Sequence, residues 1–248
     1  MSAQKFYKGR GIVLHTIKYG ESAMIVHILT DTMGRQCYMV RGIRSKRGRG
    51  SKAALFQPLF TVEFEAEMPR RSSSDLHHFK EVRSALVLGK TPFDIRRSTI
   101  ALFIAEMLYR LVQESEVNLD LFDFAWNAVE SLDKIEDGLA VANFHLWFMA
   151  NLSRELGYLP DDEYRSGFWF DIVEGKHSQN RPSSNHYLTP KVSEIFSQLL
   201  ECNIENLARI ELGRESRVEV LEGLISYYGY HLGAVHNVQS IKILKDIF

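Results

Sequence analysis

The chain has 248 residues, of which 45% are apolar and 25% charged, the composition of an ordinary globular protein with one large or two small cores. No run of residues reaches the apolar length of a membrane span, and residues 1–8 contain no apolar stretch of a signal peptide, so we expect a cytoplasmic protein. The two cysteines, Cys37 and Cys202, are far apart and neither belongs to a C-x-x-C pair, which excludes a disulfide framework and a thiolate zinc motif.

The net charge of −1 conceals an uneven distribution of charge along the chain. Residues 1–80 carry 14 Lys and Arg against 6 Asp and Glu, a balance of +8, whereas residues 81–248 carry 16 against 25, a balance of −9. A basic first part favours a polyanionic ligand, and an acidic remainder favours packing and a different partner.

The N-terminal part has the pattern of short strands separated by turn residues. In residues 60–67 four apolar side chains alternate with Thr61 and three glutamates, which predicts one buried and one wet face. The same alternation places Cys37, Met39 and Arg41 on one face of an earlier strand. Five strands with closely spaced turns fit a small barrel, and the barrel of this size most often used for nucleic acid is the OB-fold. The predicted strands cover residues 8–19, 23–29, 35–43, 58–67 and 76–82.

A basic segment, residues 41–52, lies between the third and fourth strands and reads R-G-I-R-S-K-R-G-R-G-S-K, without an acidic residue. Its three glycines interrupt any helix or strand period, so we expect a loop whose cations repel one another unless a polyanion neutralises them. Nucleic-acid phosphate is the commonest such polyanion, and a solvated charge run without function stays the alternative. Tyr7, Tyr19 and Tyr38 are expected to pack in the core or at its rim, while base stacking in a binding groove stays open for them.

After about residue 90 the hydrophobic period changes from 2 to 3.6, which predicts helices. Residues 158–188 interrupt this pattern as an irregular excursion or short hairpin, aromatic first and then rich in turn residues. We therefore predict an α+β chain with an OB-fold domain over residues 1–84 and a helical bundle domain over residues 85–248. The predicted helices cover residues 91–116, 121–137, 141–156, 190–202, 214–232 and 238–248.

The residues contain no recognisable catalytic set. The sequence contains neither of the glycine-rich nucleotide-binding motifs, and Ser22 lacks the glycine context of a nucleophile elbow. His77 and His78 are adjacent and would point to opposite faces of a strand, and His231 and His236 lack the spacing of a helical zinc site. We therefore favour a binding protein over an enzyme, with a hydrolase as the weakest alternative.

Several pieces of the chain carry a family resemblance by their order, spacing and character. They are G-I-V-L-H-T-I-K-Y-G-E-S-A-M-I-V-H-I-L-T-D-T-M-G (11–34), the basic segment 41–52, L-F-Q-P-L-F-T-V-E-F-E (55–65), G-Y-L-P (157–160), and a C-terminal Y-Y-G-Y-H-L followed by S-I-K-I-L-K-D-I-F. In these features the chain resembles the bacterial DNA repair protein RecO family over nearly its whole length. The resemblance rests on the combination of pieces, because none of them is a sharp chemical motif.

The resemblance implies an N-terminal OB-fold and a C-terminal helical domain that bind and anneal single-stranded DNA. It also implies loading of recombinase onto strands coated by single-strand-binding protein, with that protein, RecR and sometimes RecF as partners at the nucleoid; double-stranded DNA stays open as a further ligand. Many members hold zinc with four cysteines in the excursion, but residues 164–187 contain none here. We therefore predict no zinc and no other cofactor, and we expect Phe168, Trp169 and Phe170 to hold the excursion by packing on the bundle.

The predicted DNA-binding residues are cations in and around the basic segment, because neutralising a polyanion requires phosphate contacts and no bond chemistry. They are Arg35, Arg41, Arg44, Lys46, Arg47, Arg49 and Lys52, with Arg10, Arg70 and Arg71 as weaker candidates. Two other functions stay open. One is a protein–protein adaptor whose acidic helical domain is the main partner surface, and the other is an RNA-binding OB protein.

Overall fold

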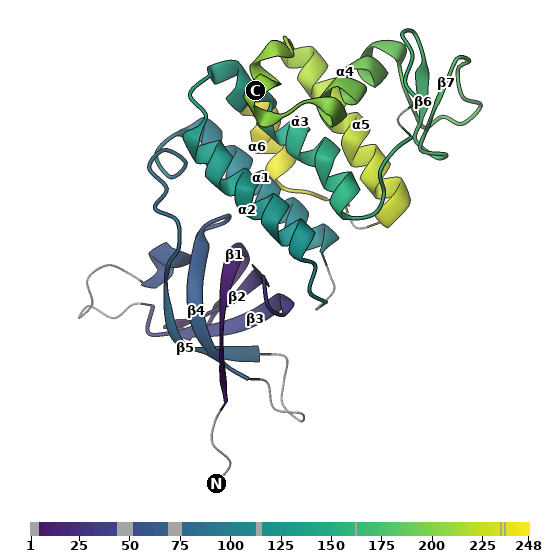
Figure 1. Cartoon of the computed structure of the whole chain (residues 1–248). Helices are drawn as coiled ribbons and strands as arrows, with labels where there is room; N and C mark the ends of the chain where they lie inside the picture. Colours follow the sequence, from purple (N-terminus) through teal and green to yellow (C-terminus); the bar gives the residue numbers. More distant parts are fainter. Residues whose placement is uncertain are drawn as a thin grey trace. The chain divides into compact units, whose positions relative to one another are not determined.

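Two compact units make up the chain, which is represented here by a computed structural model (Figure 1). The first unit comprises Met1–Gly89 and Ile104–Glu130, and the second comprises Lys90–Phe103 and Ser131–Phe248. Among the described residues, no helix combines the length and apolar character needed to cross a membrane. The structure describes residues 5–43, 52–68, 76–112, 116–161, 163–233, 235 and 237–248.

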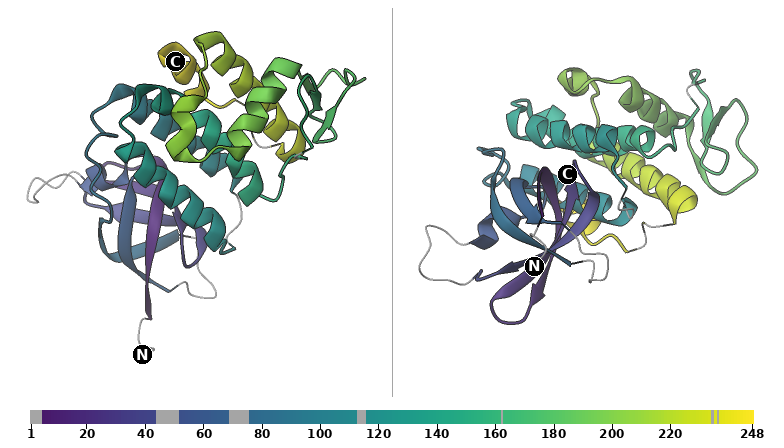
Figure 2. Two further views of the ribbon diagram at one scale, coloured as in Figure 1. Left: turned by 45° about the horizontal axis from the view of Figure 1, so that its top comes forward. Right: turned by 60° about the horizontal axis from the view of Figure 1, so that its bottom comes forward.

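The first unit contains a closed barrel of five strands (Figures 1 and 2). The strands are β1 (Phe6–Tyr19), β2 (Ala23–Thr30), β3 (Gly34–Arg41), β4 (Thr61–Glu67) and β5 (Leu76–Ser84). Their order is β1-β2-β3-β5-β4, with β4 returning to pair with β1, and β3 and β5 run parallel while the other neighbours are antiparallel. This barrel confirms the five predicted strands and the OB-fold.

Aromatic rings fill the centre of the barrel. Tyr38 is completely buried, with its ring stacked on Phe79 at a centroid distance of 4.3 Å and packed against Phe64 at 5.4 Å. Its hydroxyl lies 2.7 Å from the hydroxyl of Tyr7, and burial raises the pKa of Tyr38, so the phenol stays neutral. Tyr7 and Tyr38 therefore pack in the core and at its rim, as predicted.

The alternation predicted for β4 is confirmed with one exception. Val62, Phe64 and Ala66 are buried, as expected for the core face. Thr61 was assigned to the wet face but is 2% exposed. Its hydroxyl accepts a hydrogen bond from the backbone N–H of Leu86 at 3.0 Å, so this small polar side chain is satisfied inside the protein.

The helices follow the predicted ranges, with ends that differ by a few residues. They are α1 (Ile95–Leu111), α2 (Leu119–Lys134), α3 (Gly138–Glu155), α4 (Pro190–Glu201), α5 (Arg214–Leu232) and α6 (Ser240–Ile247), with the 3-10 turns η1 (Lys52–Phe56) and η2 (Ile204–Arg209). Asp137 caps the start of α3, since its carboxylate accepts hydrogen bonds from the N–H groups of Leu139 and Ala140. Its Phe144 and Phe148 are completely buried, which makes α3 the centre of the second unit.

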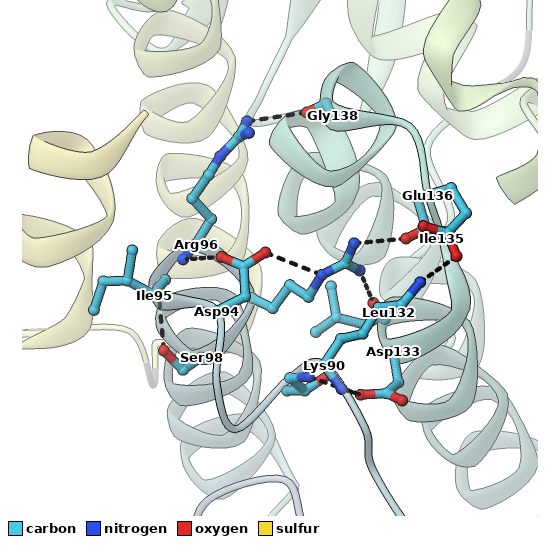
Figure 3. A network of polar contacts seen from close by, with 12 residues as sticks. Lys90, Asp94, Ile95, Arg96, Ser98, Leu132, Asp133, Ile135, Glu136 and Gly138 are labelled. Carbon is cyan, nitrogen blue, oxygen red and sulfur yellow. Dashed lines mark hydrogen bonds and ion pairs between the residues drawn. The ribbon is translucent and has the colours of Figure 1, made fainter.

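α1 begins later than predicted, at Ile95, and the end of α2 binds the residues before it (Figure 3). One carboxylate oxygen of Asp133 accepts the backbone N–H groups of Lys90 at 2.9 Å and Thr91 at 2.7 Å. In return, the buried Arg97 donates to the carboxylate of Asp94 at 3.1 Å and to two carbonyl oxygens at the end of α2. Carbonyls in a last helical turn lack intrahelical partners, so this guanidinium satisfies them.

The excursion over residues 158–188 contains a small sheet. Its strands are β6 (Trp169–Asp171), β7 (Lys176–Ser178) and β8 (Tyr187–Leu188). They lie in the order β7-β6-β8. Phe170 is completely buried, with ring centroids 5.2 Å from Phe196 of α4 and 5.8 Å from Tyr227 of α5. Phe170 therefore anchors the excursion to the helices, as predicted.

The other two aromatic residues that were expected to pack on the bundle, Trp169 and Phe168, make different contacts. Trp169 packs against Tyr187 inside the excursion, at 5.1 Å, and Phe168 is only partly buried. A four-cysteine zinc centre does not fit this region, since Cys37 and Cys202 both lie outside it. Within the described ranges no three His, Cys, Asp or Glu side chains gather as metal ligands would, and the absence of zinc stays a prediction.

Candidate nucleic-acid interface

The outer face of β1, β2 and β3 carries a ladder of side chains. Every second residue of a strand points to the same face, so these residues lie opposite those that fill the barrel. The pairing register aligns them in three rows: Tyr19, Ala23 and Arg41; Ile17, Ile25 and Met39; His15, His27 and Cys37. We call the first two the open rows and the third the covered row.

The open rows present an aromatic ring, aliphatic side chains and a cation to solvent. Tyr19 is 54% exposed and Ile17 is 43% exposed. Arg41 is also exposed, and its Nε donates to the sulfur of Met39 at 3.4 Å. Two backbone N–H groups just after β3 donate to the carbonyl of Ser22 at 2.8 and 3.1 Å, which fixes the β1–β2 turn beside them. Bases stack on such apolar and aromatic surface while phosphates meet the guanidinium.

The covered row lies under Tyr109 of α1. The Tyr109 ring is centred 4.6 Å from that of His15 and 5.0 Å from that of His27. The sulfur of Cys37 lies 3.1 Å from Nδ1 of His27. Burial lowers the pKa of both histidines, and the nearby Arg35 lowers that of His27 further, so both rings stay neutral at physiological pH.

Arg35, a predicted DNA-binding residue, also belongs to the covered end of this face. Its terminal nitrogen donates to the carbonyl oxygen of Tyr109 at 2.6 Å, and its guanidinium lies 5.1 Å from the centre of the Tyr109 ring. The cation is therefore held by a helix end and an aromatic face.

Arg10, another predicted DNA-binding residue, is likewise held within the first unit. Its Nε donates to Asp31 at 3.0 Å, and its terminal nitrogen lies 3.6 Å from Asp123 of α2. The guanidinium also stands over the rings of Phe122 and Trp126, at 5.2 and 5.0 Å. The Arg10 guanidinium thus already contacts two carboxylates and two aromatic rings.

The remaining predicted cations are distributed differently. Lys52 is the first residue of η1. Outside the described residues lie Arg44, Lys46, Arg47, Arg49, Arg70 and Arg71. Arg41 is thus the predicted site residue that the described structure places in the open rows. DNA contact by each of the ten cations stays a prediction.

Sequence reasoning missed two parts of this face. Ile17 and Ile25 were assigned to strands but not to a common outer row, although extending the alternation from Arg41 across the pairing would have found them. Tyr109 lies in the helix predicted over residues 91–116, and no sequence signal places its ring over two histidines of the barrel.

Comparison with known families covers both units. Residues 1–85 match the family model described as Recombination protein O N terminal, and residues 92–239 match Recombination protein O C terminal. Together these matches span most of the chain.

Individual relatives match over nearly their full length. The DNA repair protein RecO of Bacteroides fragilis is 35% identical over 240 residues, which cover 96% of this chain and 97% of the relative. That of Phocaeicola vulgatus is 35% identical over 239 residues, covering 96% and 97% of the two chains. That of Flavobacterium psychrophilum is 33% identical over 241 residues, covering 97% and 98%.

Proposed function

Because this chain belongs to the Recombination protein O family, whose members act in DNA repair and recombination, we propose that it binds and anneals single-stranded DNA. It also helps to load recombinase onto strands coated by single-strand-binding protein. In this proposal residues 1–84 hold the DNA and residues 85–248 meet partner proteins. Single-strand-binding protein, RecR and sometimes RecF are the partners, and the site of action is the cytoplasmic nucleoid.

The observation that carries the proposal is that the open rows include Arg41, the residue at which the basic segment begins. Arg41 is both the last residue of β3 and the first of the six cations in residues 41–52. Tyr19 lies in the same cross-strand row as Arg41. A strand of DNA whose phosphate meets Arg41 therefore has an exposed ring and aliphatic side chains next to it for its bases.

Annealing requires no bond chemistry. Two polyanions must approach while their repulsion is lowered, and their bases must stay unstacked with their pairing edges free. Cations on the phosphates provide the first condition, and stacking on Tyr19 provides the second because it uses the face of a base and not its edge. This division of work supports a binding protein that is not an enzyme.

The test is fluorescence anisotropy of labelled single-stranded DNA across a salt series. If about six phosphates are contacted, log K against log salt has a slope near −4. Replacing Arg44, Arg47 and Arg49 together with Gln is expected to flatten that slope by about 2, since each phosphate contact contributes about 0.7. A matched control replaces three exposed lysines of the second unit with Gln and is expected to leave the slope unchanged. The control residues are Lys176, Lys191 and Lys242.

Each other outcome points to a specific alternative. An unchanged slope in the arginine variant removes the basic segment from the site. If the protein does not bind single-stranded DNA even at low salt, the adaptor function of the acidic helical domain becomes the favoured alternative. Equal affinity for an RNA strand of the same length favours an RNA-binding OB protein.

A further inference from the structure

A groove of about 360 Å³ lies in the second unit, between α5 and the segment that contains β8. Three of the residues that line it, Ile172, Leu188 and Val192, are apolar and only 2–6% exposed, so they form its floor. Gly223 of α5 allows this close packing, because a Cβ there would lie 2.5 Å from a methyl carbon of Leu188. The groove is therefore bounded by tightly packed elements.

One wall of the groove is acidic. Glu215, Glu219, Glu222 and Ser226 follow one another at intervals of four, three and four residues, which places them on one side of α5. The last three of them line the groove. Glu222 is paired with Lys245 at 2.5 Å, whereas Glu219 is exposed and forms no ion pair with a described residue. A carboxylate on the wall is thus available to a cation.

The opposite wall is a sheet edge. β8 is the last strand in the order β7-β6-β8, and within the described ranges no strand pairs with its outer side. The N–H of Ile172 donates to the carbonyl of His186 at 3.0 Å. Because hydrogen-bonding direction alternates along an antiparallel pair, the intervening Tyr187 directs its N–H and C=O away from β6. All of residues 185–189 line the groove, so it follows this edge.

We propose that this groove binds an extended, basic segment of a partner protein, which adds to the sheet as a strand beside β8. Its main chain bonds with the free groups of Tyr187, and a lysine or arginine meets Glu219. Aliphatic side chains next to the cation pack on Leu188 and its apolar neighbours. Strand addition of this kind takes affinity from main-chain bonds and selectivity from alternate side chains. An acidic segment is disfavoured, because it would bring like charges together at Glu219.

The proposal is tested with a short fluorescein-labelled peptide of alternating lysine and valine, capped at both ends, titrated against the full chain. Two matched probes separate its components: a peptide with glutamate in place of lysine, and the lysine peptide with alternate backbone nitrogens methylated. We expect the lysine peptide to bind at least about tenfold more tightly than either, since each probe loses the charge pair or the main-chain bonds. Equal or tighter binding of the glutamate or methylated peptide would overturn the proposal.

Two variants test where on the protein the peptide binds. Glu219→Gln is expected to weaken binding about three- to tenfold, whereas the exposed Glu205→Gln in η2 keeps the same charge change away from the groove and leaves binding unchanged. Hydrogen exchange supplies a readout that needs no variant, because the Tyr187 amide is expected to exchange more slowly when the peptide is bound. Equal effects of the two variants, or unchanged exchange at Tyr187, would each count against this site.

Discussion

The outer face of the barrel differs between its two ends, although the same three strands form both. Arg35 and Arg41 stand on one face of β3, six positions apart in the sequence. Arg35 is bound to the carbonyl and the ring of Tyr109, whereas Arg41 is exposed beside Met39. A helix residue therefore decides which of two chemically identical side chains is free to meet a ligand.

This difference changes how the basic N-terminal part should be understood. Residues 1–80 have a balance of +8, but Arg10 already faces Asp31 and Asp123, and Arg35 already faces a helix end. Cations held in this way stabilise the first unit and are less available to phosphate. Of the two arginines on the outer face of β3, Arg41 is thus the one that is exposed to solvent.

Removing the ring of the open rows is expected to have the largest effect on function. Tyr19→Ala should weaken single-stranded DNA binding about ten- to a hundredfold, because stacking of one base contributes about 1–3 kcal/mol. The side chain is 54% exposed, so the free energy of unfolding should change by less than about 0.5 kcal/mol. DNA anisotropy and urea unfolding measure the two quantities.

Tyr19→Phe is the matched control, since it keeps the ring and removes the hydroxyl. It should bind DNA like the unaltered protein. If Tyr19→Ala binds DNA normally, the bases do not stack on the open rows.

Removing the ring that lies over the covered row should lower the stability of the protein and leave DNA binding unchanged. Tyr109→Ala removes the ring from His15, His27 and Arg35, and this is expected to lower the free energy of unfolding by about 2 kcal/mol. DNA affinity should be kept, because the open rows are untouched. The midpoint of urea unfolding measures the stability, and DNA anisotropy measures the affinity. If Tyr109→Ala loses as much affinity as Tyr19→Ala, the two ends of the face do not differ in DNA binding.

The barrel could be predicted from sequence because its signals are local. Alternation in residues 60–67 and around Met39 depends on the period of a strand, which any five consecutive residues reveal. The cover over His15 and His27 joins residues from three strands and a helix far along the chain, and Tyr109 has the same pattern as any residue on an amphipathic helix. The burial of Thr61 could not be predicted for a similar reason, since the N–H of Leu86 that satisfies its buried hydroxyl lies 25 residues along the chain.

The two arginines of β3 offer the most direct comparison. Arg41→Gln should flatten the salt dependence of DNA binding by about 0.7, the contribution of one phosphate contact to single strands. Arg35→Gln should flatten that slope less than Arg41→Gln does, because its guanidinium already binds Tyr109, and should lower the free energy of unfolding by about 1 kcal/mol, because the Tyr109 carbonyl loses a charged donor. The reverse pattern, with the slope changed more by Arg35→Gln, would show that the covered end opens to DNA.

The smallest expected effect is a pH dependence of the covered row. The pKa values of His15 and His27 are lowered in the folded protein, chiefly by burial, with Arg110 and Arg35 adding to it and Glu106 opposing it at His15. Below about pH 6.5, the ordinary histidine pKa, the unfolded chain therefore binds protons that the folded barrel does not. The stability that these neutral rings contribute is present above that pH and is lost as the pH falls through it.

Replacing His15 and His27 together with Gln should make the free energy of unfolding less sensitive to acid between about pH 7.5 and 5.5. His145, whose pKa burial lowers to about 3, contributes to the acid loss in both proteins, so the difference between them isolates the covered row. Urea unfolding at the two pH values gives the four free energies required. An identical pH dependence in the two proteins would mean that water reaches the rings of the covered row, and that Tyr109 covers this end of the barrel less completely than its ring distances indicate.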